Sequence, residues 1–296
     1  DSGKVSLPNI APQKSAKVTI KSWELTNSDG DGERFINFTI VRKSRTEWAP
    51  AGQEVGWNQF VLFSKRDVIA KSETSDLFEQ AVNEAGEIQI PFAQYAPELS
   101  LWRAPTDNDR IARITNKWEQ YGVRELERID CTITESATSF KVSSLWQTNT
   151  GYKIKQLQIV TPIENGYQVK ETITTPKQFE DLARVGISFE IDGALANFRY
   201  FGTGPHETYP DRKIARVHTW ESTVSEQYIP YVRPQENGGH AAVRWFTLTD
   251  SAGHGIRIDL DKPLQVSVNP FRATQLADAT HDVELVPTGN TIVHID

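Results

Sequence analysis

Apolar and polar residues alternate along most of the chain with the two-residue period of half-buried β-strands. In residues 184–192, RVGISFEID, the side chains of Ile187, Phe189 and Ile191 are separated by polar ones. Such alternation places apolar side chains on one face of a strand and polar side chains on the other. The pattern therefore predicts a protein built mainly of antiparallel strands.

Runs of this kind recur at short intervals and are separated by turn residues such as those at 27–32 and 50–52. No repeat period and no heptad pattern is found in the sequence. The predicted strands are AKVTIKSWEL, ERFINFTIVRK, WNQFVLFSK, EIQIPF, CTITES, SFKVSSLWQT, YKIKQLQIV, YQVKETITT, RVGISFEID, AVRWFTLTD, GIRIDL, LQVSVNPF, DVELVP and TIVHID.

Two stretches have helical spacing instead. Apolar residues between 77 and 82 repeat at the period of a helix, and Gly86 is suited to end it. A second helix is predicted over residues 111–121, behind a group of good N-cap residues and before Gly122. We expect two domains from the 296-residue length and the change of pattern. A small β-sandwich extends to about residue 66, a mixed region covers residues 67–98, and a large antiparallel β-sandwich dominates from residue 125 onward.

The charge and the cysteine content narrow the range of partners. The formal net charge is −7, and the basic residues are scattered among acidic ones, which argues against nucleic-acid binding. A neutral polar ligand fits this balance better. The single cysteine, Cys131, excludes a disulfide framework and a cysteine metal cluster. No apolar run has the length of about 18 residues that a membrane helix needs, so we expect no membrane contact and a cytoplasmic location.

Candidate chemistry is concentrated in residues 200–239, in the two clusters GTGPHETYPD and YVRPQENG. Aromatic rings beside carboxylates, amides and arginines suit a sugar, because a pyranose has an apolar C–H face and a rim of hydroxyl groups. The same pattern also fits two tight turns whose aromatic side chains pack on a sheet. The candidate residues of the two clusters are His206, Glu207, Tyr209, Asp211, Arg233, Glu236 and Asn237.

A third group, LWRAPTDNDR, holds more polar residues than one helix cap requires: Arg103, Asp107, Asn108 and Asp109. We interpret them as a rigid network. His206 and His281 each have a carboxylate nearby, which suits either proton transfer to a sugar ring oxygen or structural hydrogen bonding. The six histidines are dispersed without the spacing of metal ligands, so no metal site is predicted.

The segments LWRAPTDNDR, FGTGPHETYPDRK, YIPYVRPQENG and ATHDVEL, in this order, closely resemble the C-terminal domain of bacterial β-galactosidases of glycoside hydrolase family 2. EWAPAGQEVGWNQF resembles the sandwich that precedes that domain, so the resemblance covers nearly the whole chain. It implies an all-β protein. Residues 1–69 would form an immunoglobulin- or fibronectin-like sandwich that is incomplete at its N-terminus. Residues 70–296 would form a galactose-mutarotase-like sandwich, or supersandwich, that is incomplete at its C-terminus.

The resemblance also implies where the chemistry lies. The family is retaining and needs two carboxylates about 5 Å apart. In the family they lie on a separate (β/α)₈ barrel together with the magnesium and sodium ligands, and no βα alternation is found in this sequence. We therefore expect no catalytic residue and no cofactor in this chain. The barrel partner would be in cis or on a large subunit.

The expected function is that of a non-catalytic part of an oligomeric enzyme that hydrolyses terminal β-D-galactosides. The chain would shape the mouth of the active site, with Arg103 and Asp107–Asp109 holding the interface to the barrel and Glu236 and Asn237 lining the groove. Two alternatives remain open at this point. One is a stand-alone galactoside-binding module with an exposed aromatic platform, and the other is an aldose 1-epimerase that uses the histidine and carboxylate pairs.

Overall fold

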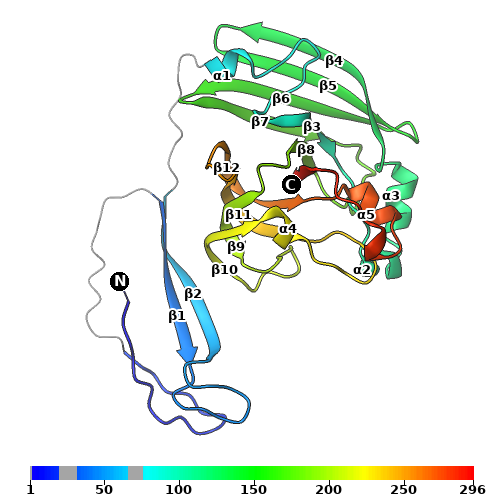
Figure 1. The fold of residues 1–296 in the computed structure, drawn as a ribbon. Helices are drawn as coiled ribbons and strands as arrows, with labels where there is room; N and C mark the ends of the chain where they lie inside the picture. The colour runs from blue at the N-terminus through cyan, green and yellow to red at the C-terminus, as the bar shows by residue number, and fades with distance from the viewer. Residues whose placement is uncertain (1, 20–31, 66–75) are drawn as a thin grey trace. The chain divides into compact units, whose positions relative to one another are not determined.

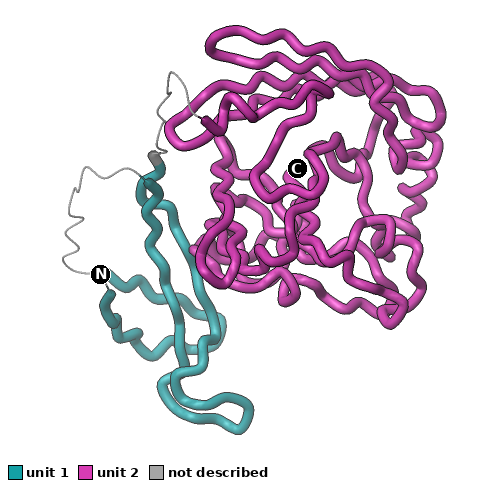
Figure 2. The backbone as a smooth tube through the Cα atoms, turned by 45° about the horizontal axis from the view of Figure 1, so that its top comes forward, with its two compact units in different colours: residues 1–68 teal, residues 69–296 magenta. Residues whose placement is uncertain are grey.

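The computed structural model describes residues 2–19, 32–65 and 76–296. The chain divides into two compact units, residues 1–68 and 69–296 (Figure 2). The predicted strand AKVTIKSWEL lies largely outside the described residues. Within the described part of the first unit, strands β1 (Gly32–Val41) and β2 (Glu54–Lys65) pair antiparallel. Both strands were predicted from their alternating pattern, and the rings of Phe38 and Phe60 meet edge to face across the pair at 5.9 Å.

The second unit contains two antiparallel sheets, which form separate layers in Figure 1. The seven-stranded sheet has the order β10-β9-β11-β12-β13-β8-β3, and the four-stranded sheet has the order β4-β5-β6-β7. This arrangement confirms the predicted all-β class. The strands are β3 (Ala93–Ser100), β4 (Leu126–Ser136), β5 (Ser139–Thr148), β6 (Lys153–Ile163), β7 (Gly166–Thr174), β8 (Gly186–Asp192), β9 (Asn197–Gly204), β10 (Arg216–Thr223), β11 (Gly239–Thr249), β12 (Gly255–Asn269) and β13 (Asn290–Ile295).

The helices of the second unit are short. They are α1 (Asp76–Glu79), α2 (Asp107–Ile111), α3 (Thr115–Tyr121), α4 (Val224–Gln227), α5 (Ala273–Asp278) and the 3₁₀ turn η1 (Asp282–Glu284). No helix in the described ranges is long and apolar enough to cross a membrane.

The largest hydrophobic cluster packs on one face of the seven-stranded sheet. Along β8 the apolar residues Phe189 and Ile191 enter this cluster, as their alternation with polar neighbours predicts. A second cluster joins α3 to the four-stranded sheet through Trp118 of the helix, Trp146 of β5 and Ile154 of β6. The second cluster also contains Leu99 of β3, so it includes residues of both sheets.

The helix predictions are correct in position and wrong in length. The stretch 77–82 forms only the single turn α1, and the chain then bends through Gly86 at φ +73°. The stretch 111–121 is divided into α2 and α3 by Arg113 at φ +56°. Gly122 ends α3 in the left-handed conformation, as expected.

Three strand predictions are also corrected. EIQIPF forms an isolated bridge at Ile88 rather than a strand, and DVELVP forms the turn η1. GIRIDL and LQVSVNPF, expected as two strands, belong to the one long strand β12. In DVELVP the apolar residues Val283 and Val286 are exposed, so their spacing did not mark the buried face of a strand.

Candidate functional site

The segment LWRAPTDNDR is fixed by the start of helix α2. Thr106 is the N-cap, its hydroxyl accepts a hydrogen bond from the amide of Asp109, and the Asp109 carboxylate accepts one from the amide of Thr106. Both Asp109 oxygens also accept from Nη2 of Arg103, at 3.0 Å. Asp107 and Asn108 are exposed. The predicted network therefore forms between Arg103 and Asp109, and it holds the turn that leads into α2.

The carboxylate of Glu207 organises the second segment. It is buried and accepts hydrogen bonds from Nη1 of Arg212 at 2.9 Å, from the hydroxyl of Tyr231, and from the amide of Gly238 at 3.0 Å. The hydroxyl of Tyr209 lies at 3.5 Å from the same carboxylate. One side chain thus connects the two clusters GTGPHETYPD and YVRPQENG, which the sequence had separated.

Asn237 and its neighbours fix the second cluster from inside. The Asn237 side chain accepts from the amide of Ile229 at 3.1 Å and donates to the carbonyl of Gln235 at 2.9 Å. Gln235 in turn accepts from the amide of Asp107 at 3.0 Å, and the amide of Glu236 donates to the carbonyl of Ala104. These bonds join YVRPQENG to LWRAPTDNDR.

Arg184, which the sequence analysis did not single out, lies at the centre of these segments. Its side chain is 3% exposed, with Nη2 2.9 Å from Glu236 and Nε 3.2 Å from Asp296. Burial alone would lower the pKa of Arg184, but the charges of Glu236 and Asp296 outweigh it and raise that pKa. We name Arg103, Asp109, Arg184, Glu207, Glu236 and Asp296 the buried ionic network.

Burial also shifts the pKa values of His294 in strand β13 and of Asp296, the residue that follows this strand. Burial raises the pKa of Asp296 to about 6, with Arg184 opposing the shift. Burial, and secondarily the charge of Arg184, keeps the pKa of His294 well below its usual value, so this imidazole is neutral. Nδ1 of His294 and Nη1 of Arg184 are buried, and neither has a hydrogen-bond partner among the described residues.

Buried contacts also fix His240, which lies at the start of β11. Nε2 of His240 contacts Oε1 of Gln227, and Nδ1 lies 2.9 Å from the hydroxyl of Tyr200. Because a glutamine oxygen only accepts, Nε2 carries the proton and Nδ1 accepts from the tyrosine. Burial lowers the pKa of His240 to about 4.

The other predicted residues lie outside the buried ionic network. His206, Asp211 and Arg233 are exposed. His281 is exposed as well, and its Nδ1 is 2.9 Å from Glu284 within the same turn. Glu207 is buried and accepts from Arg212, whereas its neighbour His206 is exposed. Among the residues that the structure describes, no group of three or more metal-binding side chains comes together.

Comparison with known protein families adds the decisive observation. The family pattern described as beta galactosidase small chain matches residues 72–296, and that described as beta-galactosidase, domain 4, matches residues 1–63. The chain belongs to the beta galactosidase small chain family. The four motif segments and the buried ionic network all lie within the matched range of this family.

Individual relatives agree with this assignment. A beta-galactosidase of Priestia megaterium is 26% identical over 98% of this chain, and BgaC of Bifidobacterium adolescentis is 26% identical over 94% of it. A beta-galactosidase of Lactobacillus delbrueckii subsp. bulgaricus is 32% identical over 64% of the chain. The matches cover 31%, 30% and 19% of these relatives, so this chain corresponds to less than a third of each of them.

Proposed function

We propose that this chain supplies a non-catalytic wall at the active-site mouth of a β-galactosidase and part of the surface through which that enzyme assembles. The parent reaction is the hydrolysis of terminal β-D-galactosides. Its two catalytic carboxylates, and the magnesium and sodium ions, belong in this proposal to a (β/α)₈ barrel in cis or on a large subunit. Membership of the family and the names of the relatives support the reaction class.

The carboxylates of the buried ionic network suit structural anchors rather than catalysis. A retaining glycosidase needs one carboxyl group that can give and take a proton and a second that can attack the sugar. Glu207 already accepts from Arg212 and Gly238, and Glu236 is paired with Arg184. Carboxylates held in this way keep the loops in place.

The observation that carries the proposal is a set of bare aliphatic side chains on these fixed loops. Five of them are at least 70% exposed, although they lie in or directly behind the four motif segments. Exposed apolar groups on loops whose backbone is already ordered favour docking, because association then costs little further conformational entropy. The five residues are Ile111, Ile214, Val232, Val283 and Val286.

The proposal is tested by complementation. Hydrolysis of a chromogenic β-galactoside is measured for the purified chain, for a separately expressed barrel-containing fragment, and for their mixture. Activity is expected only in the mixture. Val232→Asp and Val283→Asp are expected to lower the activity of the mixture at least tenfold, because each places a charge in the apolar interface. Leu77→Asp is the matched control, since Leu77 is 44% exposed on α1, outside the motif segments.

Hydrolysis by the chain alone would contradict the proposal, because it would require a nucleophile in this chain. Equal effects of the Val232, Val283 and Leu77 substitutions would contradict the docking role of the motif loops. An inactive mixture, together with galactoside binding by the chain alone, would favour the stand-alone binding module.

A further inference from the structure

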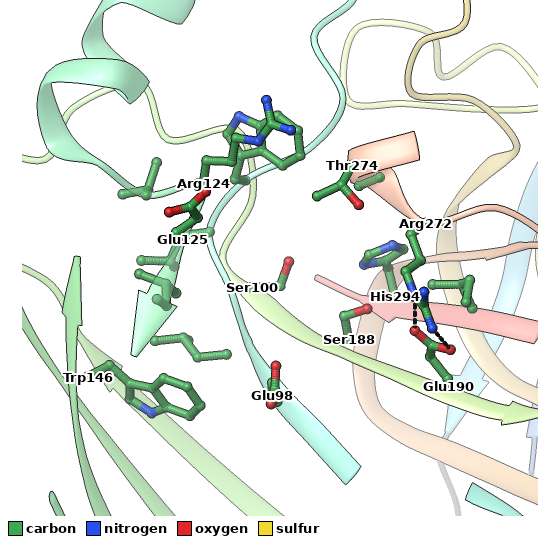
Figure 3. A pocket seen from close by; sticks show the side chains of 17 residues that line it. Glu98, Ser100, Arg124, Glu125, Trp146, Ser188, Glu190, Arg272, Thr274 and His294 are labelled. Carbon is green, nitrogen blue, oxygen red and sulfur yellow. Dashed lines mark hydrogen bonds and ion pairs between the residues drawn. The ribbon is translucent and has the colours of Figure 1, made fainter. Parts of the chain in front are cut away.

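A pocket of about 390 Å³ lies between the two sheets of the second unit. Figure 3 shows its lining: Ser188, Glu190 and His294 on one side, Trp146 on the opposite side, and Glu98 and Ser100 between them. Small-molecule sites in proteins have volumes of roughly 300 to 1,000 Å³. The pocket is therefore large enough for one or two sugar rings.

Strand pairing creates the polar side of the pocket. Ser188 of β8 lies directly opposite Glu98 of β3 and directly opposite His294 of β13, so the three residues form a row across adjacent strands. Side chains paired in this way have Cβ atoms about 5 Å apart on one face of the sheet. The next row in the same direction contains Glu190 and Ile292. Because successive side chains of a strand point to opposite faces, Phe189 packs in the core while Ser188 and Glu190 line the pocket.

The opposite side of the pocket is aromatic. Trp146 is buried, and its Nε1 donates to Gln156 at 2.7 Å, so its polar atom is already bonded. Trp102 is half-buried and lines the pocket next to Arg124, whose guanidinium lies 5.1 Å from the indole centre. Arg124 and Thr274 are exposed, which places the entrance near Trp102. The indole at the entrance suits the apolar C–H face of a pyranose, and the polar groups on the far side suit its hydroxyl groups.

The polar side of the pocket includes the imidazole of His294. His294 is 7% exposed and its buried Nδ1 has no hydrogen-bond partner among the described residues. The ring is neutral, because burial lowers its pKa. A neutral imidazole exchanges hydrogen bonds with a hydroxyl group without a change of charge.

The cations that line the pocket are already neutralised. Arg272 makes a bidentate ion pair with Glu190, in which Nη2 lies 2.9 Å from Oε2. Arg124 makes an ion pair with Asp278, in which Nη2 lies 2.7 Å from Oδ1. No positive charge is thus left to attract a phosphate or a carboxylate. The Glu98 carboxylate adds a further acceptor, and its pKa is raised by burial, with Arg128 opposing. This balance favours an uncharged ligand rich in hydroxyl groups.

We propose that the inter-sheet pocket binds a pyranose, either free or at the end of an oligosaccharide, with an apolar sugar face on Trp102 and hydroxyl groups bonded to Ser188, His294 and Glu98. Trp102 belongs to the motif segment LWRAPTDNDR, whereas Ser188, His294 and Glu98 lie outside the four motif segments. The site would bind sugar in the isolated chain. It goes beyond the proposed function and does not depend on it, because no barrel partner takes part in the binding.

The test is a titration of the purified chain with methyl β-D-galactopyranoside, lactose and inorganic phosphate, followed by intrinsic tryptophan fluorescence and by calorimetry. We expect saturable binding of the sugars and none of phosphate. Trp102→Ala is expected to weaken sugar binding at least tenfold, and Ser188→Ala several-fold. Trp48→Ala is the matched control and is expected to leave binding unchanged, since Trp48 is 69% exposed and belongs to residues 1–68.

Each outcome decides the proposal. The absence of saturable sugar binding by the folded wild-type chain would overturn it, and so would binding that Trp102→Ala and Ser188→Ala leave unchanged. Phosphate binding in place of sugar binding would also overturn it, since the arginine charges would then be free. Thermal melting of every variant verifies folding, and the small Ser188→Ala change keeps the test valid if Trp102→Ala fails to fold.

Discussion

Arg184 joins two segments that lie far apart in the sequence, through Glu236 and Asp296. Transfer of three charged groups from water to the protein interior costs several kcal/mol per ion, and their mutual attraction offsets this only while all partners are present. Removal of one partner leaves an unpaired charge in the interior. The contribution of these ion pairs to stability is therefore best measured by replacing one of the three residues.

Replacement of Glu236 by Gln is expected to lower the free energy of unfolding by about 3 to 5 kcal/mol, because Arg184 then stays buried with one counter-charge fewer. The measurement is denaturant unfolding followed by circular dichroism. Lys117→Met is the control, because the Lys117 and Asp181 side chains are 41% and 61% exposed and an exposed ion pair contributes much less to stability than a buried one. Equal losses in both variants would contradict the structural role of Arg184.

His240 predicts a dependence of stability on pH. Its pKa falls from the usual value to about 4 in the folded chain, so between about pH 4 and 6.5 the unfolded chain binds more protons at this site. Its contribution is complete above that window and is lost as the pH falls through it, by roughly 3 kcal/mol in total. Asp296 acts in the opposite direction, because its pKa is raised and its contribution is lost as the pH rises through about 6.

Because the contributions of His240 and Asp296 oppose each other, the pH dependence of the wild type alone does not isolate that of His240. The test is therefore a comparison of the wild type with a variant. The unfolding free energies of the wild type and His240→Asn are measured from pH 4 to pH 7. The wild type is expected to lose more stability on acidification than the variant. Parallel curves would show that His240 does not titrate with folding.

At the scale of elements, the loop YVRPQENG depends on the backbone of Gly238. This residue has φ +71°, and a Cβ atom there would lie 2.5 Å from the carbonyl oxygen of Gln227. Its amide donates to Glu207, so the unusual conformation also supports the buried ionic network. Only glycine satisfies both conditions.

Gly238→Ala is expected to destabilise the chain at least twice as much as Gly151→Ala. Gly151 has φ +92°, and a Cβ atom there meets nothing within 4 Å, so its substitution carries only the backbone strain of roughly 1 to 2 kcal/mol. The added loss at Gly238 comes from the clash with Gln227. Melting temperatures of the two variants give the comparison, and similar values would argue against a tight approach at Gly238.

The sequence was most informative about elements and least informative about contacts between them. Alternation located β8, and the glycine after the second helix was identified as its end, because both depend on nearby residues. The break at Arg113 was missed, since helical spacing of apolar residues continues across it. Arg184 was missed because its partners Glu236 and Asp296 are distant in the sequence. His294 lay within a predicted strand, but only the pairing of β13 with β8 shows which face it occupies.

At the scale of the whole molecule, the contacts described for the buried ionic network and the pocket all come from residues 69–296. A chain of residues 69–296 is therefore expected to melt cooperatively, at a temperature within a few degrees of the corresponding transition of the full chain. Circular dichroism measures both. A broad, non-cooperative transition in the shorter chain would show that residues 1–68 are needed for its order.

His294 belongs to both regions of that unit, since it lines the pocket and feels the charge of Arg184. Arg184 in turn holds Glu236, whose loop carries the exposed Val232. Thermodynamic linkage is reciprocal: if a sugar in the pocket strengthens the docking of a partner on the loops, the docked partner strengthens sugar binding by the same factor. The single imidazole of His294 would then couple the occupancy of the pocket to the docking of a partner on the loops.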